Sequence, residues 1–164
     1  MTPSPDSSRP TISSDAGRKG EMLRLDNQLC FQLYAASNLM TRLYRPILKK
    51  LGLTYPQYLV MLLLWEDAPR SVGDIGASLH LDSGTLTPLL KRLEAASLVV
   101  RRRDTADERR VLVDLTATGT KLRKRAEDVP SEAFQCLSIS GEEATDLREA
   151  LRGLVAQLAD PTGK

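Results

Sequence analysis

The sequence predicts a mainly α-helical fold with a small β-wing, that is, a winged helix-turn-helix joined to a helical dimerisation domain. Two neighbouring stretches predict it. Residues 71–95 contain two short runs of apolar side chains at helical spacing with a break at residues 80–81, which is typical of a helix-turn-helix. Residues 98–103 and 109–115 read as two strands around a turn-like segment, so we expect a hairpin with arginines at its tip.

The first part of the chain is expected to be a disordered tail, residues 1–24, followed by a long helix. The tail is rich in Ser, Pro, Asp and Gly and has almost nothing to bury. Residues 25–53 carry more apolar side chains than one face of a lone helix can hold, which suggests burial against a second subunit and assigns them to dimerisation. Pro46 should kink or interrupt the helix near Tyr44, and Gly52 should end it.

Residues 54–116 are expected to form the winged helix-turn-helix. Thr54 can cap a helix that Pro69 ends. Ser71 and Asp82 can cap the next two helices, because their side-chain oxygens accept hydrogen bonds from free backbone N–H groups. No strand is expected outside the hairpin. The second helix of the pair should bury a stripe of leucines, namely Leu86, Leu89, Leu90 and Leu93.

The second helix of such a pair lies in the major groove of DNA, with its N-terminal residues at base edges. Threonine and proline can pack on thymine methyl groups, and hydroxyls can hydrogen-bond to bases. On the wing, arginine suits a narrow A·T-rich minor groove, and Asp107 could hold Arg109 in an ion pair that shapes the tip. The predicted DNA-contacting residues are Ser83, Thr85, Thr87, Pro88, Lys91 and Arg92 on the helix, and Arg101, Arg103, Asp107, Arg109 and Arg110 on the wing.

The last part of the chain, residues 117–160, is expected to be helical. Thr116 can cap a helix whose pattern Pro130 should interrupt. Ser140 and Glu143 have the spacing of a capping box, which opens the final helix.

Composition limits the partners and the compartment. The formal net charge is only +2, so affinity for nucleic acid must come from a local cluster of cations such as the wing. The longest apolar run, residues 59–65, is too short to span a bilayer, and no signal-peptide pattern opens the chain. Two cysteines without such a signal favour a reducing, cytoplasmic location. A single histidine, His80, predicts no metal site, and no motif predicts a cofactor.

Residues 107–119, DERRVLVDLTATG, resemble the wing signature of MarR-family repressors, which are winged-helix homodimers. The resemblance extends over residues 25–158, and it implies that the helices of residues 25–53 and 117–160 form the dimer interface. Residues 25–34 (LDNQLCFQLY), 43–46 (LYRP) and 52–58 (GLTYPQY) further resemble OhrR, the organic-hydroperoxide-sensing branch of the family. The resemblance implies a homodimeric repressor that binds pseudo-palindromic operator DNA and leaves it when an organic hydroperoxide oxidises a reactive cysteine.

The same resemblance assigns roles to four residues. Cys30 would be the redox sensor, and Tyr44 and Tyr55 would hydrogen-bond it. Cys136 would be the resolving cysteine, which forms a disulfide with the oxidised sensor of the other subunit in the two-cysteine subclass. We also expect Cys136 to follow the break at Pro130, in a segment less rigid than the helices around it.

Position alone gives a weaker indication for Cys30. The start of a helix favours the thiolate, the form that attacks a peroxide, but an inert buried cysteine is the more common outcome. Tyr44 lies fourteen residues further on, about 21 Å along a continuous helix. A contact between the two therefore needs either a tyrosine from the partner subunit or a sharp helix break near Pro46.

Two other functions stay open at this point. One is a MarR-type repressor released by a small aromatic ligand bound without a covalent bond; its release from DNA would survive the loss of both cysteines. The other, less favoured, is a thiol peroxidase, which would need sustained peroxide turnover with a reductant and would leave the wing unexplained. We expect a regulator and not an enzyme.

Overall fold

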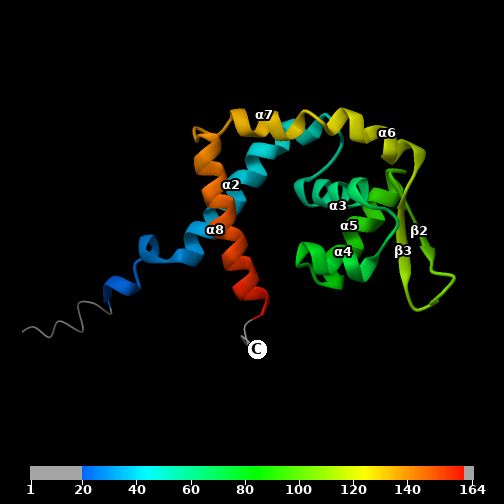
Figure 1. Cartoon of the computed structure of the whole chain (residues 1–164), viewed down its shortest axis with the longest axis horizontal. Helices are drawn as coiled ribbons and strands as arrows, with labels where there is room; N and C mark the ends of the chain where they lie inside the picture. The colour runs from blue at the N-terminus through cyan, green and yellow to red at the C-terminus, as the bar shows by residue number, and fades with distance from the viewer. Residues whose placement is uncertain (1–19, 161–164) are drawn as a thin grey trace, which may run out of the picture. The chain divides into compact units, whose positions relative to one another are not determined.

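The computed structural model describes residues 20–160 and is helical apart from one small sheet (Figure 1). The chain divides into two compact units, residues 1–42 and residues 43–164. The long helix α2 (Leu29–Lys49) begins in the first unit and ends in the second. All later helices and strands of the described chain belong to the second unit, so the mainly α-helical fold with a β-wing is confirmed.

Most of the tail that we predicted to be disordered, residues 1–24, lies outside the described residues. Its residues 20–22 have helical backbone, which differs from the prediction. The Leu23 N–H donates to the carbonyl oxygen of Gly20 (3.3 Å) and closes this turn.

The helix predicted within residues 25–53 differs from the structure at its start and at Pro46. A separate 3-10 turn, η1 (Leu25–Asn27), precedes α2, so the α-helix begins later than expected. Pro46 lies inside α2 without ending it, although proline has no N–H to donate. The side chains of Ile47 and Leu48, which follow it, are buried and hold this last turn in the core. The predicted break near Tyr44 is therefore wrong.

A tight turn joins α2 to α3 (Tyr55–Glu66). Gly52 ends the helix as predicted, with a φ of 71° that glycine adopts without a clash from a Cβ. The Thr54 N–H donates to Gln57 Oε1 (2.9 Å) at the start of α3. Helix α3 then supplies much of the core through Tyr58, Val60, Met61, Leu64 and Trp65.

Helices α4 (Val72–Leu79) and α5 (Ser83–Ala95) form the predicted helix-turn-helix. Ser71 Oγ accepts from the Asp74 N–H (3.0 Å), and Asp82 Oδ1 accepts from the Thr85 N–H (2.8 Å), so both predicted caps are confirmed. His80, in the left-handed region with φ 51°, turns the chain between the helices. The leucine stripe of α5 is buried at Leu86, Leu90 and Leu93 and half-buried at Leu89.

The wing belongs to a three-stranded antiparallel sheet of order β1-β3-β2. Strand β2 (Val99–Arg103) pairs with β3 (Val111–Leu115) as the predicted hairpin. Strand β1 (Arg70–Ser71) pairs with the other edge of β3 and was not predicted. Two residues are too few to show the alternation by which a strand is identified in a sequence, and Ser71 already reads as the cap of α4.

Helices α6 (Ala117–Ala126), α7 (Val129–Gln135) and α8 (Gly141–Ala159) complete the second unit. Pro130 lies in the first turn of α7. A backbone N–H at this position has no acceptor within the helix, so proline costs no hydrogen bond there. The predicted interruption therefore lies before Pro130 and not at it. The predicted capping box is confirmed, because the Ser140 N–H donates to Glu143 Oε2 (2.7 Å) and the Glu143 N–H donates to Ser140 Oγ (3.1 Å).

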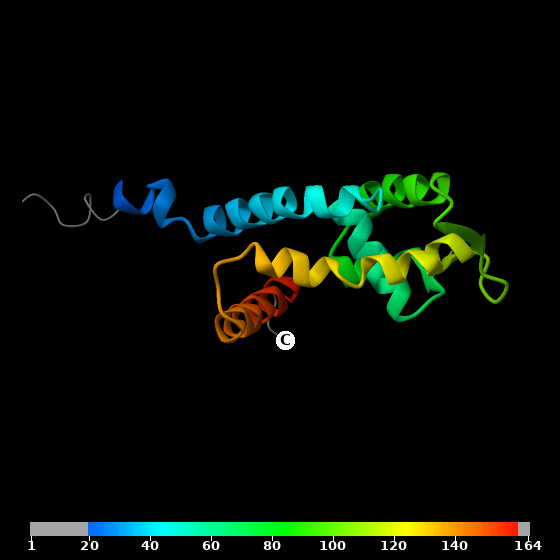
Figure 2. The ribbon, with the colours of Figure 1, turned by 90° about the horizontal axis from the view of Figure 1, so that it is seen from above.

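Figures 1 and 2 show α6 and α7 following one another in nearly the same direction, whereas α8 turns away from α7. Helix α8 buries none of its residues within this chain. Its apolar face, defined by Leu147, Leu151, Val155 and Leu158, is exposed. In the first unit, the beginning of α2 likewise exposes Leu29, Tyr34 and Leu39. Among residues 20–160, no helix is both long and apolar enough to cross a membrane.

Candidate functional site

Helix α5 presents a polar face opposite its buried leucines. Five of the six residues predicted to contact DNA from this helix are exposed, and Thr87 is half-buried. The exposed ones are Ser83, Thr85, Pro88, Lys91 and Arg92. A helix held by one apolar face and open on the other can be presented to the major groove without disturbing the core.

The Thr85 hydroxyl is already engaged by the helix cap. It donates to Asp82 Oδ2 (3.0 Å), beside the bond from its own N–H to Oδ1. These bonds from Thr85, the backbone one first, hold the pKa of Asp82 below its usual value. Asp82 is therefore charged at neutral pH, and the Thr85 methyl group remains the part that is free to meet a thymine methyl.

Besides the Asp107–Arg109 pair at the wing tip, three of the five wing arginines are paired with acids of the same unit. Two of the pairs join the wing to the helix-turn-helix, and one crosses between the two strands. The pairs are Arg101 with Glu94 (2.6 Å), Arg110 with Asp74 (3.3 Å) and Arg102 with Asp114 (3.6 Å). Sequence reasoning missed these partners because Glu94 and Asp74 lie on helices, and only the fold brings them to the wing.

The wing tip is the turn between β2 and β3, and it contains Arg109. Its backbone N–H and its Nε both donate to Asp107 Oδ1, at 3.1 and 3.2 Å, so the predicted pair is confirmed. The Arg109 side chain is nevertheless 91% exposed. The guanidinium therefore faces solvent while Asp107 holds its Nε and the backbone N–H. Arg103, at the end of β2, is also exposed, and its side chain has no partner within the described part of the chain.

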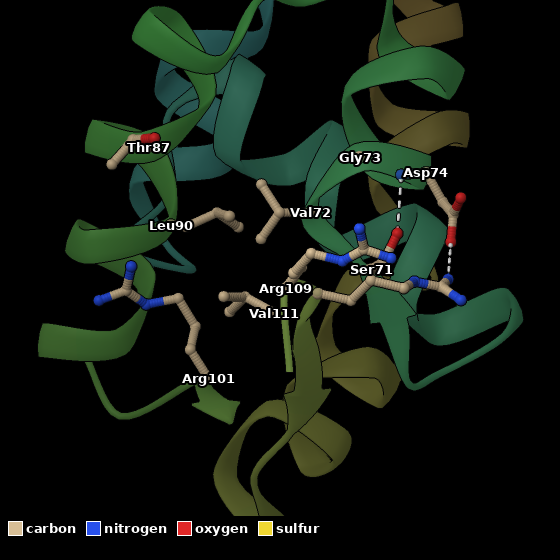
Figure 3. Close-up of a pocket in the computed structure, with 10 residues that line it drawn as sticks. Ser71, Val72, Gly73, Asp74, Thr87, Leu90, Arg101, Arg109 and Val111 are labelled. Carbon is tan, nitrogen blue, oxygen red and sulfur yellow. Dashed lines mark hydrogen bonds and ion pairs between the residues drawn. The ribbon is translucent and has the colours of Figure 1, made fainter. Parts of the chain in front are cut away.

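A hollow of about 550 Å³ lies between the start of α4, helix α5 and the wing. Figure 3 shows Thr87 and Leu90 on the α5 side and Arg109 and Val111 on the wing side. Cationic side chains thus line a groove beside α5, the recognition helix that is expected to enter the major groove. Such a groove suits a phosphate backbone. The lining residues are Ser71, Val72, Gly73, Asp74, Thr87, Leu90, Arg101, Arg109, Arg110 and Val111.

Both cysteines are free and exposed. Cys30 is the second residue of α2 in the first unit, so it lies in the first helical turn as predicted. Cys136, in the second unit, ends α7, and its thiol donates to the carbonyl oxygen of Glu132 (3.4 Å). It is the residue that caps the C-terminus of α7, whose first turn contains Pro130. That this segment is less rigid than the helices around it stays a prediction. Within residues 20–160, no group of His, Cys, Asp and Glu side chains could hold a metal ion.

Four aromatic rings cluster at the junction of α2 and α3. The ring centroids of Tyr44 and Tyr55 are 4.8 Å apart, those of Tyr44 and Tyr58 6.2 Å, and those of Tyr58 and Trp65 6.4 Å. Burial raises the pKa of the Tyr44, Tyr55 and Tyr58 phenols above their ordinary value. All three hydroxyls are therefore protonated donors at neutral pH. Tyr44 and Tyr55, the two tyrosines predicted to hydrogen-bond the sensor, lie in contact with each other, and Tyr58 packs beside Tyr44. Nothing in the sequence distinguishes Tyr58 from other core residues.

A second hollow, of about 190 Å³, lies between α3 and the helices α6 and α7. Tyr58 and Trp65 form part of its wall, and Arg123 supplies a cation. Sites for small organic ligands usually measure about 300–1,000 Å³. This hollow is too small to favour the alternative of a non-covalent aromatic inducer.

Comparison with known proteins identifies the family. Residues 42–126 match the family described as transcriptional regulator SarA/Rot. The chain is similar to the organic hydroperoxide resistance transcriptional regulator of Bacillus subtilis strain 168, with 48% identity over 85% of this chain and 95% of that protein. It is also similar to the HTH-type transcriptional regulator TtmR of Methylorubrum extorquens strain PA1, with 51% identity over 93% of this chain and 75% of that one.

The structure of reduced AbfR bound to DNA matches with a TM-score of 0.70 and 38% identity, over 85% of this chain and 98% of that one; AbfR is a protein of Staphylococcus epidermidis. The disulfide form of AbfR matches with a TM-score of 0.58 at 39% identity, over the same shares of the two chains. The chain therefore belongs to the MarR family of winged-helix, DNA-binding transcriptional regulators, where it groups with the organic hydroperoxide resistance regulator.

Proposed function

We propose that this protein is a homodimeric repressor whose operator binding is switched off when an organic hydroperoxide oxidises Cys30. The observation that carries the proposal is the exposed Cys30 thiol in the first turn of α2, in a chain similar to an organic hydroperoxide resistance regulator. A peroxide can reach such a thiol, and a helix N-terminus favours the anion that reacts with it. The relative AbfR, solved both reduced on DNA and in a disulfide form, supports a redox switch.

Two copies would read a pseudo-palindromic duplex, with their α5 helices in successive major grooves about 34 Å apart. The exposed apolar face of α8 and the exposed beginning of α2 supply surface for the dimer interface. In each half-site, α5 would contact bases and phosphates, and the wing would enter the adjacent minor groove. The proposed base contacts are Thr85, Thr87 and Pro88, and the proposed phosphate contacts are Lys91 and Arg92.

Arg109→Ala should weaken operator binding by about 1–3 kcal/mol. It removes an exposed guanidinium that Asp107 holds in place through the backbone N–H and Nε of Arg109. If the group neutralises a phosphate, the slope of log affinity against log salt should also fall by about one. Fluorescence anisotropy of a labelled operator at several salt concentrations measures both quantities. Lys124→Ala, which removes an exposed cation from α6, is the matched control and should bind as the wild type does. Unchanged affinity of Arg109→Ala at physiological salt would remove the wing from the mechanism.

The proposed oxidation has two balanced steps. The Cys30 thiolate attacks the terminal oxygen of the hydroperoxide ROOH, and the O–O bond breaks to give a cysteine sulfenic acid and, after protonation, the alcohol ROH. The Cys136 thiol of the other subunit then attacks the sulfenic sulfur. An S–S bond forms, the S–O bond breaks and water leaves.

The tyrosines would prepare the thiolate for the first step. Tyr44 and Tyr55 lie together, and their raised pKa values keep them protonated, so each can donate a hydrogen bond to a thiolate and stabilise it. Because α2 is uninterrupted at Pro46, a helix break cannot bring Tyr44 back to Cys30 of the same chain. The donors would therefore come from the partner subunit, which makes the sensor a shared site of the dimer.

Cys136→Ser tests the second step. In the wild type, an equimolar organic hydroperoxide should give a dimer-sized band on a non-reducing gel, which a thiol reductant collapses. Cys136→Ser should lose this band, still oxidise at Cys30, and proceed to sulfinic and sulfonic acids because no thiol traps the sulfenic acid. Mass spectrometry of the tryptic peptides reads out these states. A Cys30–Cys136 bond within one chain, seen as an oxidised monomer, would contradict the intersubunit step.

A further inference from the structure

One carboxylate joins the recognition helix to the wing. Glu94 lies in the last turn of α5, and Arg101 lies in the middle of β2. The Arg101 Nε and one terminal nitrogen donate to Glu94 Oε2 at 3.0 and 2.6 Å, and the Arg101 backbone N–H donates to Glu94 Oε1 at 3.2 Å. Glu94 thus holds both the side chain and the backbone of the same wing residue.

This pair is less exposed and makes more hydrogen bonds than the Asp74–Arg110 pair, which also joins the wing to the helix-turn-helix. The side chains of Glu94 and Arg101 are 35% and 27% exposed, whereas those of Asp74 and Arg110 are 58% and 50% exposed and share a single contact of 3.3 Å. Exposed single contacts add little, whereas the partly buried Glu94 carboxylate accepts three hydrogen bonds from Arg101, two of them from the guanidinium to one oxygen. Charge-assisted hydrogen bonds of this kind are stronger than neutral ones and fix the groups that they join. The hydrogen bonds from the Arg101 side chain lower the pKa of Glu94, so the carboxylate is charged at neutral pH.

We propose that Glu94 is a positioning residue for DNA binding, which sets the angle of the wing to the recognition helix by holding Arg101. The recognition helix and the wing contact different grooves, so both fit only when the angle between them is correct. Arg101 would then act through Glu94 and not through a phosphate, which revises the DNA contact predicted for it. The inference rests on DNA binding and is independent of the redox switch.

The direction in which Glu94→Gln changes the affinity for DNA separates a positioning role from a purely electrostatic one. A carboxylate near DNA repels the phosphates, so its neutralisation should strengthen binding if charge is all that it contributes. Glu108, on the wing, is the matched control: it is exposed, and within the described chain its side chain has no partner. Glu108→Gln should bind the operator equally well or more tightly. Glu94→Gln removes the same charge but should bind roughly tenfold more weakly, because it loses charge-assisted hydrogen bonds to the wing.

Hydroxyl-radical footprinting of the full-length dimer at saturating protein shows where the contact is lost. Glu94→Gln should lose protection in the minor grooves that the wings cover and keep it in the central major grooves, a pattern that a general loss of folded protein does not produce. Uniform loss of protection across the site would overturn the proposal, as would binding by Glu94→Gln that is as tight as that of Glu108→Gln.

Arg101→Gln supplies a second, independent test. If Arg101 acts only through Glu94, Arg101→Gln and the double variant with Glu94→Gln should weaken binding by the same factor as Glu94→Gln alone, and the salt slope should keep its wild-type value. A slope lower by about one in Arg101→Gln would show that Arg101 neutralises a phosphate and would overturn the proposal. Oxidation of Cys30 has no part in either experiment.

Discussion

Gly119→Ala should destabilise the protein by about 3 kcal/mol or more. A Cβ at Gly119 would lie 2.0 Å from the carbonyl oxygen of Leu98, at the base of the wing. Neither Leu98 nor Gly119 can move away easily, because hydrogen bonds hold the carbonyl group of each. The Leu98 oxygen accepts from the Thr116 N–H (3.1 Å) and hydroxyl (3.2 Å), and the carbonyl oxygen of Gly119 accepts from the buried Trp65 Nε1 (2.9 Å).

Urea unfolding at a fixed protomer concentration measures this loss. Gly153→Ala is the matched control, because Gly153 lies inside α8 and a Cβ there meets nothing within 4 Å. Replacing glycine by alanine inside a helix stabilises it by up to about 1 kcal/mol, so the two variants should change stability in opposite directions. A Gly119→Ala protein as stable as the wild type would mean that α6 does not pack closely against the wing base.

Cys30→Ser should bind the operator as the wild type does and stay bound under hydroperoxide. Serine is nearly the same size as cysteine, and Cys30 is exposed, so the fold should not change, but a hydroxyl is not oxidised by peroxide. The wild type should lose affinity by roughly 5- to 150-fold at the same dose, the range typical of coupling between two sites. Anisotropy titrations of the two proteins, reduced and oxidised, give the comparison.

Cys136→Ser is the matched control for this experiment, because it removes the other thiol and leaves the sensor in place. It should still react with the hydroperoxide at Cys30. Release of Cys30→Ser from the operator at the dose that releases the wild type would exclude Cys30 as the sensor. Release that survives the loss of both cysteines would point instead to a non-covalent inducer.

The caps were predictable from the sequence because their interactions are local. Ser71, Asp82 and Ser140 each accept a hydrogen bond from the backbone three residues further on, so the residue type and its spacing contain the whole interaction. The Asp107–Arg109 pair at the wing tip spans two residues and was predictable for the same reason. Helix and strand order therefore followed from short-range patterns.

Features that depend on tertiary contacts were not predictable. Strand β1 (Arg70–Ser71) exists only because β3 lies beside it. Pro46 stays inside α2 because the residues after it are buried. Arg101 reads as one of five similar wing arginines until the fold places Glu94 beside it. Tyr58 likewise reads as a core residue, and only packing brings it to Tyr44.

The most direct test of the redox switch is operator binding by the wild-type dimer before and after one equivalent of an organic hydroperoxide. A duplex selected from a random pool by the reduced protein serves as the operator. We expect tight binding when the protein is reduced, release after oxidation, and recovery when a thiol reductant is added, because the disulfide is reversible. Equal affinity before and after treatment, in a sample whose Cys30 is shown by mass spectrometry to be oxidised, would contradict it.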